Sequence, residues 1–299
     1  MMTKPLYSNY MKIALCGRNR ISNNILSILE RKHNVCIKCF TSIQSEKFND
    51  VFGDFSTFSE AKGFDVCRSD NTKEGIESLF IDIEKFNHDL ILSVQFPFIF
   101  KKTFISLFKN KILNIHFGHL PQFRGVAPIS HAIISGCNSF GVTFHIIDKG
   151  IDTGPIVFSN MFDIKGLRNS EIYYLCISHA TDVFEKNIDF IIKTIEHDRH
   201  LKNISTKQDS INSRYYSKKD FDYENNIIDF TQDMADVLKK MRAYYFPPLT
   251  YPMVELNNAT YKIIDFIEAE SFSPSNKNNI NEHTFKIKDQ VITTILEII

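Results

Sequence analysis

The stretch MKIALCGRNRISNNILSILERKHNVCIKCFT (11–41) decides the fold of this 299-residue chain. MKIALCG (11–17) is a continuous apolar run that ends in glycine, which is typical of a buried parallel strand followed by a turn. ISNNILSILERKH (21–33) has apolar residues at helical spacing, with Ser22 as the expected N-cap. NVCIKCFT (34–41) has the composition of a second strand. This order of strand, helix and strand predicts a parallel sheet.

The same alternation continues along the chain. A long irregular stretch (41–71) precedes a predicted helix at 72–87 and a strand at 88–95. A short helix at 104–111 and a strand at 112–117 follow. The order β-α-β-(α)-β-α-β predicts a doubly wound α/β domain with a mainly parallel sheet.

The later part of the chain divides into a continuation of this domain and a region of different composition. GVTFHIID (141–148) alternates in the manner of a strand, KGIDTGPI (149–156) is a glycine-rich loop, and a long amphipathic helix is predicted at 169–197. Beyond residue 203 the chain is polar and rich in tyrosine, and it continues into one more helix and a small β region. We therefore predict an N-terminal extension (1–10), an α/β domain (11–205) and a small α+β C-terminal region (206–299).

Composition excludes few classes of function. Lys plus Arg equals Asp plus Glu, 35 of each, so net charge argues neither for nor against a nucleic-acid partner. No run of about 18 apolar residues suggests a membrane span, and the first residues lack the apolar core of a secretory signal. Cys36 and Cys39 form a CxxC, but they lie inside a predicted strand and no second pair follows. A structural role in a reducing cytoplasm is the expectation.

The loops that follow the parallel strands contain most of the reactive side chains. In such sheets ligands bind beyond the carboxyl ends of the strands, where CGRNR (16–20), QFPFIF (95–100) and HFGHLPQFRG (116–125) should meet. The first turn is not GxGxxG, so a dinucleotide site is not expected. Arg18 and Arg20 beside a helix start could bind a phosphate, or they could be two solvated arginines.

Three residues supply a set of groups suited to acyl transfer. Asn114 and His116 are two apart on a strand and share one face, and Asp152 lies on the glycine-rich loop. Transfer to an amine needs a donor for the developing oxyanion and groups that manage the amine proton. Each residue alone could be a turn former, a satisfied histidine or a loop cap. A metal site formed with His119 is also conceivable, but HxxH on a loop of Gly and Pro is a weak metal pattern, and we predict no metal.

The pattern N-I-H-x-x-x-L-P-x-x-R-G-x-x-P (114–128), followed by G-V-T-x-H-x-x-D-x-x-I-D-T-G (141–154), resembles the folate-dependent formyltransferases. The resemblance implies a Rossmann-like domain in which Asn114, His116 and Asp152 form a catalytic triad. It also implies transfer of a formyl group from N10-formyltetrahydrofolate, as co-substrate, to an amine. Asn114 and His116 would stabilise the charged oxygen, and Asp152 would position His116 or help to remove the amine proton.

The resemblance also places the folate. Its pterin would lie against QFPFIF and the 148–152 loop, with contacts expected from a small set of residues: Phe98, Phe100, Asp148 and Ile151. The two phenylalanines could equally be ordinary core residues. Phe117-Gly118-His119 stands where many members have Pro-Ser-Leu. This departure keeps the triad and changes the pocket wall, so it bears on the acceptor.

The acceptor is inferred from the region beyond residue 200. Family members act on initiator methionyl-tRNA, on glycinamide ribonucleotide or on nucleotide-linked amino sugars. Acidic side chains slightly outnumber basic ones from 200 to 299, which disfavours a polyanion such as tRNA. The glycinamide enzymes resemble only the first 200 residues. The sugar N-formyltransferases resemble this chain best, which implies a dTDP-linked 4-amino-4,6-dideoxyhexose used in bacterial surface polysaccharide such as the lipopolysaccharide O-antigen.

The same resemblance suggests the substrate contacts and the assembly. The nucleotide sugar would be bound by residues from both ends of the chain: Arg18, Tyr215, Tyr216 and Arg242. By analogy, the C-terminal region would also form a homodimer surface, and no nucleic acid or membrane partner is expected. The alternatives are a methionyl-tRNA formyltransferase and a non-catalytic protein that binds folate or a nucleotide sugar.

Overall fold

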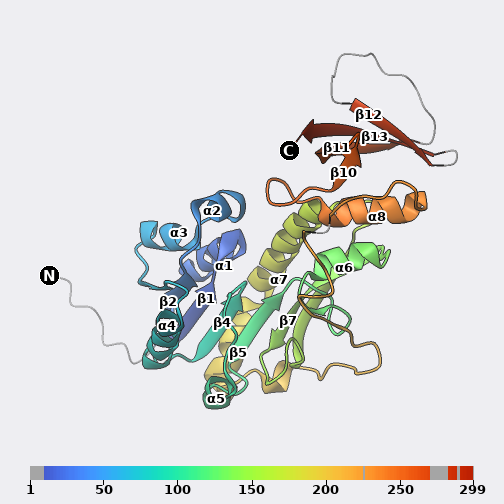
Figure 1. Cartoon of the computed structure of the whole chain (residues 1–299). Helices are drawn as coiled ribbons and strands as arrows, with labels where there is room; N and C mark the ends of the chain where they lie inside the picture. Colours follow the sequence, from blue (N-terminus) through green and yellow to red (C-terminus); the bar gives the residue numbers. More distant parts are fainter. Residues whose placement is uncertain (1–9, 225, 270–281, 288–289, 299) are drawn as a thin grey trace. The chain divides into compact units, whose positions relative to one another are not determined.

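The computed structural model describes residues 10–224, 226–269, 282–287 and 290–298, so most of the predicted N-terminal extension (1–10) lies outside the described residues. The chain, whose helices and strands are labelled in Figure 1, forms two compact units, and each unit is made of three separate segments of the sequence. Unit 1 comprises the segments up to Arg124, Gly141–Met161 and Leu175–Arg214. Unit 2 comprises Gly125–Phe140, Phe162–Tyr174 and the segment from Tyr215 onward.

Seven strands form the central sheet in the order β3-β2-β1-β4-β5-β7-β8. β1, β2, β3, β4 and β5 pair in parallel, and β7 runs antiparallel to β5. This confirms the predicted doubly wound, mainly parallel α/β fold. The strands are β1 (Met11–Gly17), β2 (Val35–Ser42), β3 (Val66–Ser69), β4 (Leu90–Val94), β5 (Ile112–His116), β7 (Ser139–Ile146) and β8 (Ile156–Asp163).

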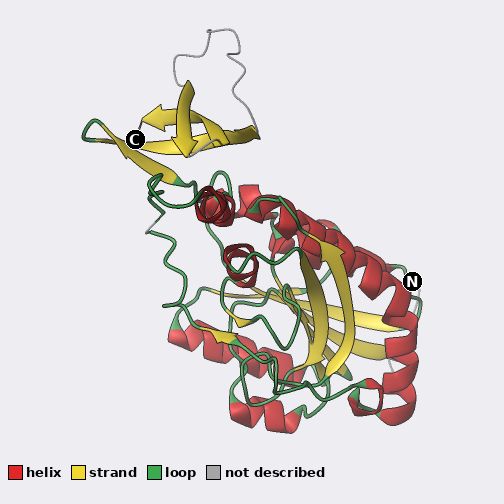
Figure 2. Ribbon diagram, turned by 90° about the vertical axis from the view of Figure 1, so that its right-hand side faces the viewer, coloured by secondary structure: helices red, strands yellow, loops and turns green. Residues whose placement is uncertain are grey.

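Helices cover both faces of this sheet (Figure 2), which is why β1 and β4 are mostly apolar and almost wholly buried. Ala14 and Cys16 on β1 pack in a cluster with Leu79 of α4 and Phe104 of α5. α1 contacts α7, where Asn24 Nδ2 donates to Thr181 Oγ1 at 3.1 Å. The helices are α1 (Asn19–Glu30), α2 (Glu46–Phe52), α3 (Phe55–Ala61), α4 (Lys73–Lys85), α5 (Lys102–Leu107), α6 (Pro128–Ile134), α7 (Asn169–Asp198) and α8 (Met234–Tyr244).

The start of α1 corrects one prediction. Ser22 is not the N-cap, because the helix begins earlier, after Arg18, with Asn19 in the left-handed region at φ 68°. Ser22 is buried in the first turn, and its Oγ lies 2.7 Å from the carbonyl oxygen of Arg18 and 3.1 Å from that of Val94, so the two carbonyls share its one O–H. The hydroxyl therefore joins the start of α1 to the end of β4.

The stretch predicted as irregular (41–71) contains α2, α3 and β3. Seven-residue helices have too few turns to show a clear period, which is why the sequence pattern missed them. Their caps are ordinary, since Ser45 accepts from the backbone N of Phe48 and Asp54 accepts from the backbone N of Ser56. α6 was missed for the same reason, although Pro128 begins it as a first-turn proline would.

Unit 2 contains the small β region. Four antiparallel strands lie in the order β10-β11-β13-β12, and α8 packs against them through Val237 and Met241. The strands are β10 (Met253–Leu256), β11 (Ala259–Ala269), β12 (Glu282–Ile287) and β13 (Gln290–Ile298). A separate two-stranded pair joins β6 (Arg124–Gly125) to β9 (Tyr215–Tyr216).

The segment 205–214 stays with unit 1, whereas the sequence suggested a boundary near residue 205. Thr206 and Ile156 exchange two backbone hydrogen bonds of 2.8 Å. Arg214 donates its backbone N–H to the carbonyl of Pro121 at 3.1 Å and accepts from the backbone N of Arg124 at 3.1 Å. This segment is thus attached to both loops that follow β5 and β7.

Two further findings concern the cysteines and the membrane. Burial raises the pKa of Cys39, on β2, to about 12, which suppresses the reactive thiolate and supports the structural interpretation of the CxxC. Within the described ranges, none of the helices combines the length and the apolar character that crossing a membrane requires.

His88, which precedes β4, is a buried histidine whose effect on the stability of the fold depends on pH. Its ring packs on Phe108, with centroids 4.4 Å apart, and its Nδ1 donates to the carbonyl of Ile83 at 3.1 Å. Burial lowers the pKa of His88 to about 4, because the charged ring would lose its hydration. The neutral ring thus stabilises the fold fully above the unfolded pKa near 6.5, and this contribution is lost as the pH falls through 4.

We therefore expect the free energy of unfolding to decrease as the pH is lowered, by up to roughly 3 kcal/mol from His88 alone. His88→Leu should lack this part of the slope between pH 7.5 and 4.5, as measured by urea unfolding. His33→Leu, at an exposed position before β2, is the matched control and should keep the parent slope. Equal slopes in the parent and His88→Leu would contradict the prediction.

Candidate active site

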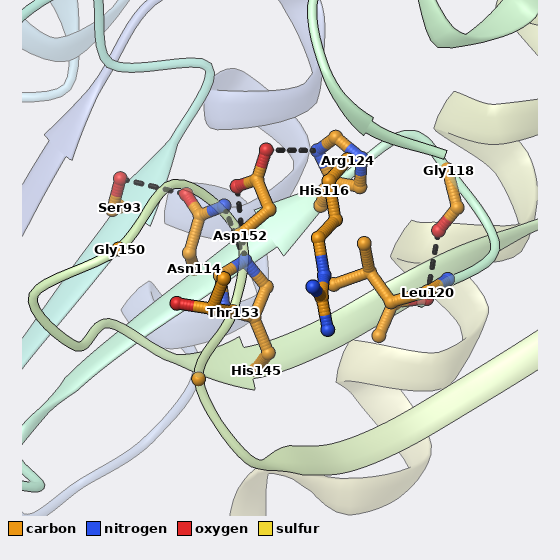
Figure 3. Close-up of polar contacts among 12 residues, drawn as sticks. Ser93, Asn114, His116, Gly118, Leu120, Arg124, His145, Gly150, Asp152 and Thr153 are labelled. Atoms are coloured by element: carbon orange, nitrogen blue, oxygen red, sulfur yellow. Dashed lines mark hydrogen bonds and ion pairs between the residues drawn. The ribbon is translucent and has the colours of Figure 1, made fainter. Parts of the chain in front are cut away.

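A row of polar side chains crosses three neighbouring strands of the sheet. Ser93 lies beside Asn114 in the parallel pair β4–β5, and Asn114 lies opposite His145 in the antiparallel pair β5–β7. Ser93 Oγ donates to Asn114 Oδ1 at 2.8 Å, and Asn114 Nδ2 lies 3.0 Å from His145 Nε2 (Figure 3). His145 Nδ1 lies 3.1 Å from the carbonyl of Ile146, which can only accept. Nδ1 therefore carries the hydrogen of the neutral ring, and Nε2 accepts from the amide of Asn114.

His116 and Asp152 complete the cluster. His116 Nε2 donates to the carbonyl of Phe123 at 2.7 Å, which leaves Nδ1 on the side of Asp152. Asp152 lies between two imidazoles, with Oδ2 3.8 Å from His116 Nδ1 and Oδ1 3.4 Å from His145 Nε2 (Figure 3). The side chains of Asp152, His116 and His145 are 15%, 10% and 2% exposed. The structure thus brings the predicted Asn114, His116 and Asp152 together.

Asn114 and Asp152 compete for one nitrogen of His145. When the ring is neutral, Nε2 accepts from the amide of Asn114. When the ring is protonated, Nε2–H can pair with Asp152 and can no longer accept from Asn114. A proton that enters the cluster therefore changes which of the two side chains His145 holds, and it frees the Asn114 amide to donate elsewhere.

The loop that presents Asp152 is tightly constrained. Asp148 Oδ1 accepts from Thr153 Oγ1 at 2.5 Å, so this carboxylate closes the loop. Gly154 admits no side chain, because a Cβ there would lie 1.7 Å from the carbonyl oxygen of Ile146. Asp152 itself has φ 52°, a left-handed conformation that costs a non-glycine residue of order 1–3 kcal/mol. Such strain persists only where surrounding contacts hold it, and it is concentrated at functional sites.

Gly118 determines how His116 is oriented. A Cβ at this position would lie 2.4 Å from His116 Nε2 and 2.9 Å from the carbonyl oxygen of Phe123. It would therefore stand in the way of the hydrogen bond between these two groups. Glycine at the position where many formyltransferases have serine is thus what this orientation of His116 requires.

His119, the residue weighed as a metal ligand, is half-buried, and burial lowers its pKa. Among the residues that the structure describes, no group of three or more His, Cys, Asp or Glu side chains is arranged to hold a metal ion.

The residues predicted to contact folate differ in how far they are buried. Phe100 is buried in the core of unit 1, where its ring centroid lies 5.6 Å from that of Phe80 and 5.5 Å from that of Phe104. This is the core position that the sequence left open as an alternative. Phe98 is half-buried, and Ile151 is 42% exposed beside Asp152. Contact of these residues with folate stays a prediction.

The predicted nucleotide-sugar contacts belong to both units. In unit 1, the guanidinium of Arg18 lies over the ring of Phe48, 5.2 Å from its centroid. In unit 2, Tyr216 is buried and stacks on His131, with ring centroids 3.8 Å apart, while Tyr215 is 56% exposed. Arg242 lies in the last turn of α8, and burial lowers its pKa. Their contact with a nucleotide sugar stays a prediction.

Three residues at the site were not singled out by the sequence: Ser93, His145 and Gln208. Ser93 and His145 flank Asn114 across the sheet, and Gln208 donates from Nε2 to the carbonyls of Asp152 and Gly154. His145 is part of the quoted motif GVTFH, so an antiparallel pairing of its strand with ILNIH would have indicated it. Gln208 gave no signal, because it is 56 residues from Asp152.

The known proteins that this chain resembles in sequence are formyl transferases. Residues 38–181, just under half of the chain, match the family described as formyl transferase. A methionyl-tRNA formyltransferase of Finegoldia magna is 30% identical over 128 residues, covering 42% of this chain and 41% of that protein. One of Wolbachia pipientis is 29% identical over 229 residues, covering 75% and 69%. The chain thus spans about two fifths of the length of the Finegoldia relative.

Solved structures are similar over more of the chain. WlaRD, a sugar 3N-formyltransferase crystallised with dTDP and 5-N-formyl-THF, is 25% identical with a TM-score of 0.72, covering 96% of this chain and 97% of that one. An N-formyltransferase of Helicobacter canadensis, in complex with folinic acid and dTDP-3-aminofucose, is 23% identical with a TM-score of 0.72, covering 96% and 100%. A 4-N formyltransferase of Francisella tularensis is 21% identical with a TM-score of 0.63, covering 83% and 93%. The last two show the fold alone.

Substitution of Gly118 tests the orientation of His116. In Gly118→Ala the added methyl group should displace the ring and break its bond to the carbonyl of Phe123. The ¹⁵N NMR signal of a protonated Nε2 should then be lost or exchange with the other tautomer. Gly63→Ala is the control, since it has a left-handed φ of 80° but nothing near its Cβ, so it destabilises the fold without touching the site. An unchanged His116 signal in Gly118→Ala would refute the assignment.

Proposed function

We propose, from the premise that this chain belongs to the formyl transferase family, that it is a folate-dependent N-formyltransferase. It would transfer a formyl group from N10-formyltetrahydrofolate to the amine of a nucleotide-linked amino sugar. The observation that carries the proposal is the position of Asp152, whose carboxylate lies between His116 and His145 beside the amide of Asn114.

The cluster suits attack by a neutral amine on a formyl carbon. A bond forms between the amine nitrogen and the formyl carbon, the bond from that carbon to N10 breaks, and the amine proton leaves. Asp152 would accept that proton, with the two imidazoles at 3.8 and 3.4 Å to share it. N10 would take up a proton as it departs. General acid–base help of this kind is typically worth about 10²–10⁴ in rate.

Stabilisation of the oxyanion falls to Asn114 and His116. Ser93 holds the Asn114 oxygen, so the Nδ2 group is the end that faces the cluster. One of its two N–H groups donates to His145, which leaves a second for the developing oxyanion. His116 already donates from Nε2, so a proton at Nδ1 would make it an imidazolium next to the charge. One oxyanion donor is typically worth about 10²–10³ in rate.

The residues present fit the formyl donor in chemistry. The loop 147–155 has exposed Ile151 next to the half-buried Asp152, which places an apolar surface beside the reacting group. Phe98 adds a half-buried ring after β4. These two side chains and Asp148 are the contacts we propose for the pterin, with Phe100 supporting them from the core.

The acceptor we favour is a dTDP-linked amino-deoxyhexose. Support comes from the likeness to WlaRD, which covers 96% of this chain and whose crystals contain dTDP, and from the slightly acidic region beyond residue 200. The resemblance to the sugar N-formyltransferases suggested a 4-amino sugar, whereas the likeness to WlaRD favours a 3-amino sugar. We propose that the enzyme is a cytoplasmic homodimer and that its product serves surface polysaccharide synthesis. The nucleotide sugar would contact Arg18, Tyr215, Tyr216 and Arg242.

A methionyl-tRNA formyltransferase is the second candidate. It is favoured by the names of the curated relatives, including those of Finegoldia magna and Wolbachia pipientis. A basic surface for the polyanion would be expected in that case, and the balance of charges beyond residue 200 speaks against one.

The test is formyl transfer from N10-formyltetrahydrofolate to a panel of acceptors: dTDP sugars with a 3-amino or a 4-amino group, a uridine-diphosphate 4-amino sugar, and methionyl-tRNA. We expect turnover of one dTDP sugar, reduced at least about 10²-fold in Asp152→Asn because the proton acceptor is lost. Asp163→Asn makes the same change at an exposed position on β8 and should leave turnover unchanged. Turnover of tRNA alone would overturn the acceptor, and no turnover at all would favour a binding protein.

A further inference from the structure

Gln208 connects the two loops that surround the cluster. Its Oε1 accepts from Arg124 Nε at 3.0 Å and from Arg124 Nη2 at 2.7 Å. Its Nε2 donates to the carbonyl of Asp152 at 2.8 Å and to that of Gly154 at 2.7 Å. A side-chain amide has two N–H groups and one oxygen that accepts twice, so every hydrogen-bonding position of Gln208 is used. The residue is 8% exposed.

The backbone on either side of Gln208 is attached to the same two loops. Thr206 is paired with Ile156, just after the loop of Asp152, through two backbone hydrogen bonds. Arg214 is paired with the loop after β5 through Pro121 and Arg124. The segment 206–214 therefore spans both loops, and Gln208 is the side chain by which it reaches the backbone of Asp152.

The bond to the carbonyl of Asp152 bears on how its carboxylate is aimed. Asp152 has φ 52°, a conformation that an aspartate keeps only when its surroundings fix it. A fixed carbonyl holds the peptide plane that follows Asp152, and so it opposes rotation to a relaxed backbone. Such a rotation would turn the carboxylate away from His145, 3.4 Å away, and from His116, 3.8 Å away.

We propose that Gln208 is a positioning residue of the transfer reaction. It holds Asp152 in its strained backbone conformation, so that the carboxylate faces the two imidazoles, and it ties this loop to Arg124. The proposal rests on the proposed function, since its kinetic consequence is a slower formyl transfer. Gln208 touches neither the formyl group nor the amine in this account and acts through Asp152.

Gln208→Glu separates the contact with Arg124 from the contacts with the carbonyls of Asp152 and Gly154. The carboxylate keeps the volume of the amide and still accepts from Arg124, where the pair becomes charge-assisted. On the other side, an oxygen replaces the N–H groups and faces the carbonyl oxygens of Asp152 and Gly154. The variant thus loses the hold on Asp152 with little change in packing. Gln208→Leu removes both sets of contacts.

The experiment measures formyl transfer in the full-length protein with the acceptor that the panel identifies. Gln208→Glu should lower kcat about 10–10²-fold, since small misplacements of a catalytic group cost about that much, with KM for both substrates within about threefold of the parent. In an Asp152→Asn background the same substitution should cost less than about twofold, because residues that act as a unit are not additive. Gln232→Glu, an exposed glutamine in unit 2, should match the parent.

Two kinetic results would overturn the proposal. One is a kcat of Gln208→Glu within twofold of the parent. The other is a fall in kcat that is as large when Gln208→Glu is added to Asp152→Asn as when it is made in the parent. If the parent itself turns over none of the acceptors, the proposed function fails and the proposal is judged by hydrogen exchange instead. Backbone amides in peptides covering 121–126 and 147–155 should then exchange faster in Gln208→Leu than in the parent and Gln232→Glu. Unchanged exchange in both peptides would overturn it.

Discussion

The structure of this site depends on one requirement, which is that the half-buried amide of Asn114, in the middle of a mainly apolar sheet, must have its polar atoms satisfied. Asn114 lies on β5 between β4 and β7, and leaving its oxygen or nitrogen without a partner would cost up to about 1–3 kcal/mol, the penalty of a fully buried group. Ser93 satisfies the oxygen and His145 satisfies one N–H. These two bonds fix which end of the amide faces the cluster, and the carbonyl of Ile146 fixes the tautomer of His145. The arrangement needs β7 antiparallel to β5, since that pairing puts His145 opposite Asn114.

The second element is a strained loop held by its surroundings. Asp152 takes a left-handed backbone conformation, Gly154 allows the chain to pass against the carbonyl of Ile146, and the side chain of Asp148 closes the loop. The cost of this conformation is comparable to the net value of the two or three hydrogen bonds that hold it, at about 0.5–1.5 kcal/mol each. These contacts hold the loop so that the carboxylate of Asp152 stays aimed at the two imidazoles, at 3.4 and 3.8 Å.

The departure from the usual formyltransferase motif has a local physical explanation. Two motifs indicated the family, and the match over residues 38–181 confirms that resemblance. At the position where many members have serine, Gly118 leaves room for His116 to reach the carbonyl of Phe123. The sequence analysis attributed this change to the pocket wall and the acceptor. The structure adds that it also sets which nitrogen of His116 faces Asp152.

The sequence by itself determined the α/β order and the long helices, because these depend on periodicity. It singled out Asn114, His116 and Asp152 as candidates, because two motifs resemble those of a known family. The sequence analysis missed α2, α3 and α6, because a helix of seven residues has about two turns, too few for a repeating pattern of apolar residues to be recognised. Only the tertiary structure decided the partners of the cluster. Ser93 and His145 become neighbours of Asn114 through strand pairing, whose register no local pattern contains. Gln208 reaches Arg124 across 84 residues of sequence, and such a contact exists only once the chain has folded back on itself.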